Sequence, residues 1–152
     1  MKVLDFGIVG AVRESAERSQ MHTRGNAVRG TPAFIAPEQA MGTDLDCRAD
    51  IYATGCVAYW LLTGQFVFTA DTPMGLLLQH AQMPPTPPSA RTELPIPAAL
   101  DELVLSCLAK DPAKRPQSAR ELSLRLAELE GAGAWTQDRA RDWWVTHQPA
   151  MS

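Results

Sequence analysis

The sequence of 152 residues is long enough for one compact domain with a hydrophobic core. Its 45% apolar and 20% charged residues are ordinary for a soluble globular protein. The formal net charge of −3 excludes an electrostatic argument for nucleic acid or for an anionic membrane surface as a partner.

The cysteines Cys47, Cys56 and Cys107 are odd in number and far apart, and the histidines are equally dispersed. This pattern fits reduced thiols better than a disulfide framework or a zinc site. The N-terminus has no apolar region typical of a signal peptide, and the longest apolar run, residues 51–62, is too short to span a bilayer. We therefore expect a cytoplasmic protein.

Residues 2–4 are a short β-prone start that leads directly into Asp5-Phe6-Gly7. Taken alone, this tripeptide is better explained as a strand end followed by a turn. A polar run, residues 13–28, follows with little apolar periodicity and indicates an adjustable loop. The run ends at Gly30-Thr31, shortly before Ala36-Pro37-Glu38.

Asp-Phe-Gly followed within a few tens of residues by Ala-Pro-Glu brackets the activation segment of protein kinases. The chain therefore resembles the C-terminal lobe of a serine/threonine protein kinase of the kind common in bacteria. The resemblance implies a mainly α fold, the large lobe of the protein-kinase-like fold, with a short β start and no N-terminal lobe. We expect residues 1–130 to form a partial kinase domain and residues 131–152 to form a linker and a short tail helix.

The resemblance assigns the clearest chemical role to Asp5. This carboxylate would hold the Mg²⁺ ion that bridges the phosphates of ATP. Phe6 would pack as the aromatic side chain that sets the active or inactive state, and Gly7 would let the backbone swing. Asp5, Phe6 and Gly7 are thus the expected ATP and metal contacts.

The loop offers hydroxyl groups that could carry regulatory phosphate, among them Ser15, Ser19 and Thr23. Thr23 is favoured because related bacterial kinases carry threonines at about this distance before the Gly-Thr pair. An unmodified, solvated threonine remains an alternative of similar weight. By the same resemblance, Thr31 supports catalysis by hydrogen bonding near the catalytic aspartate.

Residues 30–38 resemble the substrate-docking loop of the family, with Phe34 where a tyrosine is more usual. Glu38 needs a cationic partner if it is buried, because an unpaired interior carboxylate is costly. The family places this partner late in the chain, where Arg115 stands, and a guanidinium can hold a carboxylate with two hydrogen bonds. We expect a structural pair.

Residues 47–63 predict a helix that is apolar nearly all round and ends at Gly64, so we expect it to be the buried central helix. Asp50 lies in its first turn, where a carboxylate meets the positive end of the helix dipole. The resemblance also gives Asp50 hydrogen bonds from the catalytic loop, and the alternative is a plain N-terminal anion. We expect Gly55 to have a structural role, and Trp60 stands where a glutamate is frequent in the family that the chain resembles.

Further helices follow in the order of the family. Thr72-Pro73 predicts a capped helix with one buried face of Met74, Leu77, Leu78 and Ala81, and residues 72–82 are a frequent docking surface in the family. Proline-rich residues 84–97 connect it to an amphipathic helix. That helix buries Leu100, Leu103, Val104, Cys107 and Leu108.

Ser118 and Glu121 predict a capping box for a last lobe helix. Its expected buried stripe is Ala119, Leu122, Leu126 and Leu129, with Gly131 as the stop. After Gly131-Ala132-Gly133, Thr136 can cap a tail helix that carries Trp143 and Trp144. We favour a tail that folds back onto the lobe, and the alternative is a docking helix for a partner.

Residues 1–152 contain no Gly-rich loop, no strand lysine and no His-Arg-Asp loop. The parent reaction is ATP-dependent phosphorylation of serine or threonine in proteins, and we expect no turnover from this chain alone. One hypothesis is a kinase fragment truncated just before Asp5, and the other is a non-catalytic docking module. Protein substrates or regulators would bind through residues 30–38 and 72–82. Uncovered apolar surface predicts marginal stability or self-association.

Overall fold

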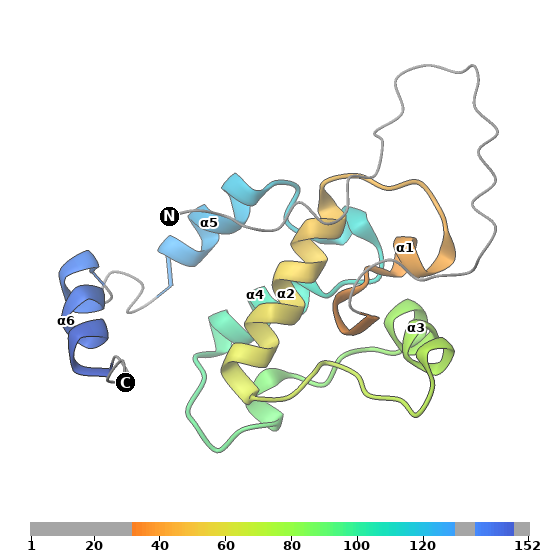
Figure 1. The fold of residues 1–152 in the computed structure, drawn as a ribbon. Coiled ribbons are helices and arrows are strands. Elements are labelled where there is room, and N and C mark those ends of the chain that lie inside the picture. The colour runs from red at the N-terminus through yellow and green to blue at the C-terminus, as the bar shows by residue number, and fades with distance from the viewer. Residues whose placement is uncertain (1–31, 130–135, 148–152) are drawn as a thin grey trace.

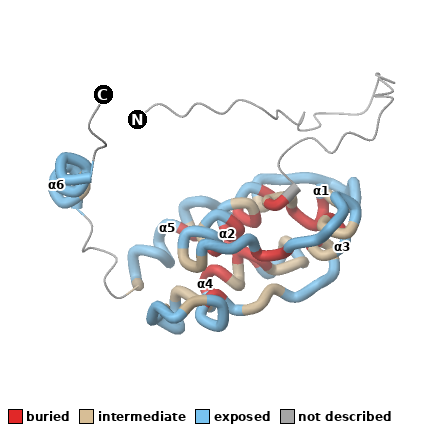
Figure 2. The backbone as a smooth tube through the Cα atoms, turned by 60° about the horizontal axis from the view of Figure 1, so that its bottom comes forward, coloured by how far each residue is buried: buried red, intermediate tan, exposed pale blue. Residues whose placement is uncertain are grey.

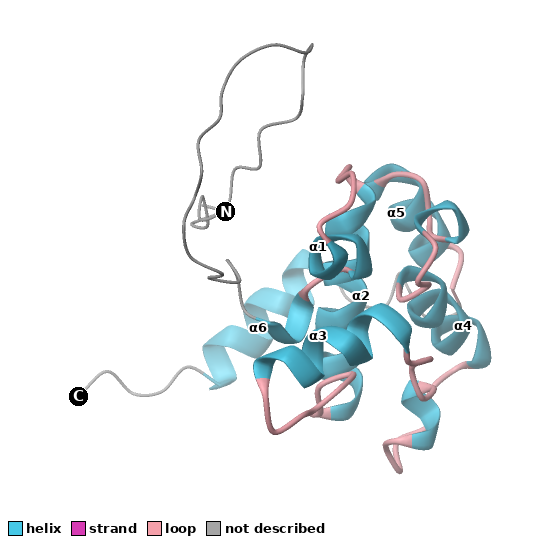
Figure 3. Ribbon diagram, turned by 90° about the vertical axis from the view of Figure 1, so that its right-hand side faces the viewer, coloured by secondary structure: helices cyan, strands magenta, loops and turns pink. Residues whose placement is uncertain are grey.

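A computed structural model of the chain describes residues 32–129 and 136–147 (Figure 1). The described residues form α-helices and short 3₁₀ helices without a strand, as expected for a mainly α fold (Figure 3). The β start predicted for residues 2–4 lies outside the described residues. In chain order the elements are η1 (Pro32–Phe34), α1 (Pro37–Met41), α2 (Arg48–Thr63), α3 (Pro73–Gln82), η2 (Pro88–Ala90), α4 (Ala98–Cys107), η3 (Pro112–Lys114), α5 (Ala119–Ala127) and α6 (Gln137–His147).

Helix α2 is the longest of these and has a defined start and stop. The Asp46 carboxylate accepts a hydrogen bond from the backbone N–H of Arg48 at 2.8 Å, which satisfies a donor of the first turn. At the other end, Gly64 has a φ of 68°, and its N–H donates to the carbonyl of Trp60 at 2.7 Å. Glycine adopts this left-handed conformation without steric cost, so the helix ends where the sequence predicts.

The core lies around α2 (Figure 2). Tyr52, Cys56 and Tyr59 of α2 pack in one cluster with Val104 of α4 and the adjacent Leu108. A second, smaller cluster joins Ile51, Leu103, Cys107 and Leu122, with Leu129 against it. The residues predicted to be buried on α4 are buried, except that Leu100 is only half-buried.

Gly55 explains how closely α2 and α4 approach. A Cβ atom at position 55 would lie 2.7 Å from the Cβ of Cys107, which is too close for two carbon atoms. The absent side chain therefore lets the two backbones come together, and this is the structural role of Gly55.

Two predictions about buried faces need correction. Helix α2 is not buried all round, because Val57, Trp60 and Leu61 are exposed on one side. On α3 the expected face is also wrong: Leu77 is buried, but Met74 and Leu78 are exposed. A polar residue, His80, takes the buried place at the end of that helix, because its ring finds a hydrogen-bond partner inside the core.

Thr72 does cap α3, since its hydroxyl accepts from the N–H of Gly75 at 3.0 Å.

Helix α5 is less buried than its sequence pattern predicts. Leu122 is buried and Leu129 half-buried, but Ala119 and Leu126 are exposed. The hydroxyl of Ser118 accepts from the N–H of Glu121, so this half of the capping box is present. The other half is shifted, because the Glu121 carboxylate accepts from the N–H of Gln117 rather than from that of Ser118.

Thr136 caps α6 as predicted, with its hydroxyl accepting from the N–H of Arg139 at 3.2 Å. The favoured fold-back of this helix is not what the structure has. No residue of α6 is buried, and Figures 1 and 2 draw the helix apart from the others.

Candidate functional site

The segment of residues 33–38 is held against the neighbouring helices by its small and apolar side chains. Ala33, Ala36 and Pro37 are buried, and the N–H of Ala36 donates to the side-chain oxygen of Gln39 at 2.8 Å. The ring of Phe34 meets that of Phe66 edge to face, with centroids 5.9 Å apart. The ring of Phe34 therefore has a packing partner of its own.

Glu38 and Arg115 form a buried, bidentate ion pair. Nη1 of Arg115 donates to Oε1 of Glu38 at 2.6 Å, and Nη2 donates to Oε2 at 2.7 Å. Glu38 is 5% exposed and Arg115 is 3% exposed, so each charge depends on the other. The sequence prediction that a buried Glu38 meets Arg115 thus describes the contact in the structure.

Arg115 also binds three backbone carbonyls. Its guanidinium donates to the carbonyls of Arg48 at 2.9 Å, Ala109 at 2.8 Å and Lys110 at 3.2 Å. All three nitrogens of the group are therefore used. One side chain ties the segment that ends at Glu38 to the start of α2 and to the turn after α4.

A second polar group, built on Tyr52, lies next to this ion pair. The guanidinium carbon of Arg115 is 5.0 Å from the Tyr52 ring centroid. The Tyr52 hydroxyl lies 2.9 Å from Nδ1 of His80, and Nζ of Lys110 donates to that hydroxyl at 3.4 Å. Lys110 also donates to the carbonyl of His80 at 2.7 Å and sits 4.5 Å from the centroid of Phe68.

Burial sets the charge of this group. Together with the nearby Lys110 ammonium, which acts in the same direction, burial lowers the pKa of His80 to about 4. A neutral His80 can accept the Tyr52 O–H at Nδ1 and then carries its proton on Nε2, which has no hydrogen-bond partner among the described residues. Burial also lowers the pKa of Lys110 to about 8 and raises that of Tyr52.

Sequence reasoning missed the Tyr52, His80 and Lys110 group. The sequence did contain a partial signal that His80 is buried, because His80 stands three residues after Leu77 and therefore lies on the same side of the helix. Which tyrosine would meet it could not be read from spacing, since Tyr52 lies on another helix.

The predicted docking residues 72–82 fall on α3 and its cap. Helix α3 packs against α1, and its exposed face carries Met74 and Leu78, which are 62% and 52% exposed. The segment of residues 33–38 and helix α3 therefore lie on neighbouring parts of the molecule (Figure 3).

The remaining predicted site residues are not brought together by the described part of the structure. Asp50 is exposed in the first turn of α2. The expected catalytic, cofactor and phosphorylation positions lie outside the described residues, namely Asp5, Phe6, Gly7, Ser15, Ser19, Thr23 and Thr31. Within residues 32–129 and 136–147, no three His, Cys, Asp or Glu side chains gather as a metal site. Over the same ranges no helix has the length and apolar character needed to cross a membrane.

Comparison with known proteins decides the family. The model of the protein kinase domain matches residues 1–124. The chain belongs to the protein kinase family. The chain is 43% identical over 129 residues to the serine/threonine-protein kinase PknB of Mycobacterium tuberculosis, which covers 85% of this chain and 20% of that protein.

Two further kinases show the same pattern. The probable serine/threonine-protein kinase PknB of Corynebacterium glutamicum is 43% identical over 132 residues, with 85% of this chain and 20% of that kinase covered. The serine/threonine-protein kinase pkn3 of Myxococcus xanthus is 39% identical over 131 residues, with 86% and 24% covered. The chain thus spans about a fifth to a quarter of the length of these kinases.

Proposed function

We propose that the chain supplies the activation segment and the protein-docking surface of a serine/threonine protein kinase. The parent reaction is the transfer of a phosphoryl group from ATP to serine or threonine in a protein. The buried Glu38–Arg115 pair is the observation that carries this proposal. It fixes the end of the segment that begins at Asp5, so the residues before Glu38 have a rigid anchor on the lobe.

Asp5 is the proposed Mg²⁺ ligand, and Phe6 and Gly7 are the proposed neighbours of the nucleotide. When bound, the ion neutralises charge on the ATP phosphates. Thr31 is proposed to support catalysis, and Thr23 and Ser19 are the proposed phosphorylation sites. A phosphate there would add about −1.5 to −2 charge to the loop, which arginines such as Arg24 could bind.

We further propose that the polypeptide of residues 1–152 does not transfer phosphate by itself. Phosphoryl transfer depends on positioning and on charge stabilisation by several groups, and Asp5 is the one metal ligand of the family that this sequence matches. The purified chain, incubated with labelled ATP and casein, is expected to give no transfer above background. Transfer that Asp5→Ala abolishes and Asp44→Ala preserves would contradict this proposal.

The parent activity needs its own test. In a chimera, the kinase residues upstream of the matched region in Mycobacterium tuberculosis PknB are joined to this chain. The chimera should phosphorylate casein, and Asp5→Ala should lower the rate by at least about a hundredfold, because the metal ligand is lost. A chimera that folds and is inactive would count against a competent activation segment.

A second candidate function is a docking module without catalysis. It is favoured by the exposed Met74 and Leu78 on α3, which offer an apolar contact to a protein partner. A folded but inactive chimera that still binds protein substrates, with binding weakened by Leu78→Lys, would favour this alternative. A cytoplasmic location is part of both proposals.

A further inference from the structure

The connection from α3 to α4 begins with an extended segment, residues 83–88, in which four of the six residues are proline. Met83 has a φ of −81° and a ψ of 133°, and Pro87 has a φ of −55° and a ψ of 139°. These angles are close to those of polyproline II, and the proline rings between them hold φ near the same value. The segment therefore has the geometry of a left-handed helix with three residues per turn and no internal hydrogen bonds.

Burial along the segment follows this period of three. Pro84 and Pro87 are exposed, whereas Pro85 is half-buried and Pro88 is buried. One edge of the polyproline II helix therefore faces the neighbouring elements, and the edge that carries Pro84 and Pro87 faces solvent. Apolar rings are thus presented to solvent at a fixed spacing of three residues.

The third edge of the segment carries Met83 and Thr86. Met83 is 51% exposed and Thr86 is half-buried. Because these two residues directly precede the exposed prolines, the solvent side displays the dipeptides Met83-Pro84 and Thr86-Pro87. The two dipeptides lie one turn of the polyproline II helix apart.

Both ends of the segment are held by hydrogen bonds. The N–H of Met83 donates to the carbonyl of Gln79 at 2.9 Å, at the end of α3. At the other end, the backbone N–H and the hydroxyl of Ser89 donate to the Asp101 carboxylate of α4 at 2.9 and 2.8 Å. The segment is therefore fixed before it meets a partner, and a ligand that is already ordered loses less conformational entropy on binding.

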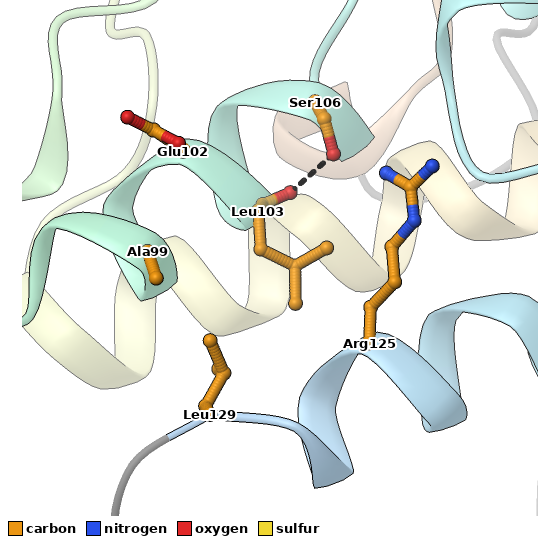
Figure 4. Close-up of a pocket in the computed structure, with 6 residues that line it drawn as sticks. All are labelled: Ala99, Glu102, Leu103, Ser106, Arg125 and Leu129. Carbon is orange, nitrogen blue, oxygen red and sulfur yellow. Dashed lines mark hydrogen bonds between the residues drawn. The ribbon is translucent and has the colours of Figure 1, made fainter.

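On its other side, α4 borders a pocket that it shares with α5 (Figure 4). Arg125 of that pocket is already paired with Glu121 at 2.7 Å, and the Glu102 carboxylate points away from it. The pocket therefore lacks a free charge directed into it, whereas Pro84 and Pro87 are open to a partner.

We propose that residues 83–87 are a binding site for a protein domain with an SH3-type groove. Such grooves are lined by aromatic rings and bind P-x-x-P segments in the polyproline II conformation, with one pocket for each X-Pro pair. Met83-Pro84 and Thr86-Pro87 supply the two pairs at the required spacing. The buried edge of the segment leaves both pairs accessible from the solvent side.

Arg91 indicates the charge of this partner. The turn formed by η2 brings its guanidinium back to the segment, where Nη2 donates to the Thr86 hydroxyl at 3.5 Å. Nη1 donates to the side-chain oxygen of Gln65 at 3.3 Å, and both bonds are long and exposed. A carboxylate at the rim of the groove would bind Arg91 by a charge-assisted hydrogen bond, which is stronger than either. The proposed partner therefore has an aromatic groove flanked by acidic side chains.

Binding of the full 152-residue chain to an array of purified SH3 domains, with the Kd of each binding domain measured by calorimetry, tests this proposal. Pro84→Ala and Pro87→Ala should each weaken binding at least about tenfold, because a few central contacts carry most of the energy of an interface. Pro95→Ala is the matched control, since Pro95 is also an exposed proline of the connection but lies outside residues 83–87, and it should leave the Kd unchanged. Arg91→Gln should weaken binding and reduce its dependence on salt.

A synthetic peptide of residues 82–91 separates presentation by the fold from sequence alone. The folded chain should bind at least as tightly as the peptide, because its segment is already ordered. Binding by the peptide but not by the chain overturns the proposal, since the fold then hides the segment. The proposal is also overturned if no SH3 domain binds the chain, or if Pro84→Ala and Pro95→Ala weaken binding equally. Thermal unfolding is measured for each variant, and Pro84→Ala decides the test if Pro87→Ala destabilises the fold.

Discussion

At the scale of single residues, the interior of the described part of the chain is held by charges and polar rings as well as by apolar packing. The Arg115 guanidinium satisfies Glu38 and three carbonyls, and its neighbour Tyr52 joins His80 and Lys110. Removing one partner of such a buried ion pair typically costs about 3–5 kcal/mol, because the other charge is left unpaired. Replacement of either residue would therefore be expected to loosen the segment of residues 33–38.

His80 should make the stability of the fold sensitive to acid. Its pKa is lowered to about 4 in the fold by burial and by Lys110, against 6.5 in the unfolded chain. Between these values the unfolded state binds a proton that the folded state does not, so stability falls as the pH falls from 6.5 toward 4. From pH 7 to pH 5, His80 should lower the free energy of unfolding by about 2 kcal/mol.

Urea unfolding of the wild type and of His80→Gln at both pH values measures this loss. The decrease between pH 7 and pH 5 should be about 2 kcal/mol smaller in His80→Gln, while His147→Gln, at an exposed position of α6, should behave as the wild type. Equal decreases in all three proteins would show that His80 is not the group responsible.

At the scale of elements, the crossing of α2 and α4 depends on an absent side chain. Alanine has a higher helix propensity than glycine by about 1 kcal/mol, so propensity alone predicts that Gly55→Ala stabilises α2. The crossing predicts the opposite sign, because the added Cβ would lie 2.7 Å from that of Cys107. Packing and propensity thus make contrary predictions at one position.

Gly55→Ala is expected to lower the free energy of unfolding by about 1–3 kcal/mol, since overpacking outweighs propensity. Thermal or urea unfolding measures the change. Thr54→Ala, one residue earlier on the exposed side of α2, should change stability by no more than about 0.5 kcal/mol. A Gly55→Ala protein more stable than the wild type would mean that the helices separate at little cost.

At the scale of the whole molecule, the described part of the chain leaves a side of its central helix uncovered. Val57, Trp60 and Leu61 of α2 are 43%, 45% and 70% exposed. Apolar burial is worth roughly 25 cal/mol per Å², so a few hundred Å² left open is comparable to a sizeable part of a domain's stability. The sequence predicts self-association of the chain, and we expect two copies to meet through this exposed side of α2.

Leu61→Lys should weaken self-association of the 152-residue chain by about tenfold or more, because burying one leucine contributes roughly 1.5–3 kcal/mol. Sedimentation equilibrium over a range of concentrations measures it. Leu94→Lys is the matched control, since Leu94 is also 70% exposed but lies in the proline-rich connection. If the wild type is monomeric, or if both substitutions weaken self-association equally, the exposed side of α2 is not the contact surface.

Much of the described fold could be predicted from local patterns. Helix ends depend on groups within a few residues of one another, so the spacing in the sequence is enough to find them. This holds for the end of α2 at Gly64 and for the caps at Thr72, Ser118 and Thr136. The expected contact of Glu38 with Arg115 came instead from family resemblance combined with the cost of an unpaired carboxylate. The functional roles of Asp5, Thr23 and Thr31 stay predictions.

By itself, the sequence determined the mainly helical content, the end of α2 at Gly64, the caps at Thr72, Ser118 and Thr136, and the family resemblance, because these are carried by short-range patterns and by ordered motifs. Only the tertiary structure decided which side of each helix is covered. Periodicity shows that a face is apolar but not whether a neighbour reaches it, so Leu61 and Leu126 were expected to be buried and are exposed. The same limit hid the meeting of Tyr52, His80 and Lys110, which come from segments far apart in the chain and converge only when α2, α3 and the turn after α4 pack together.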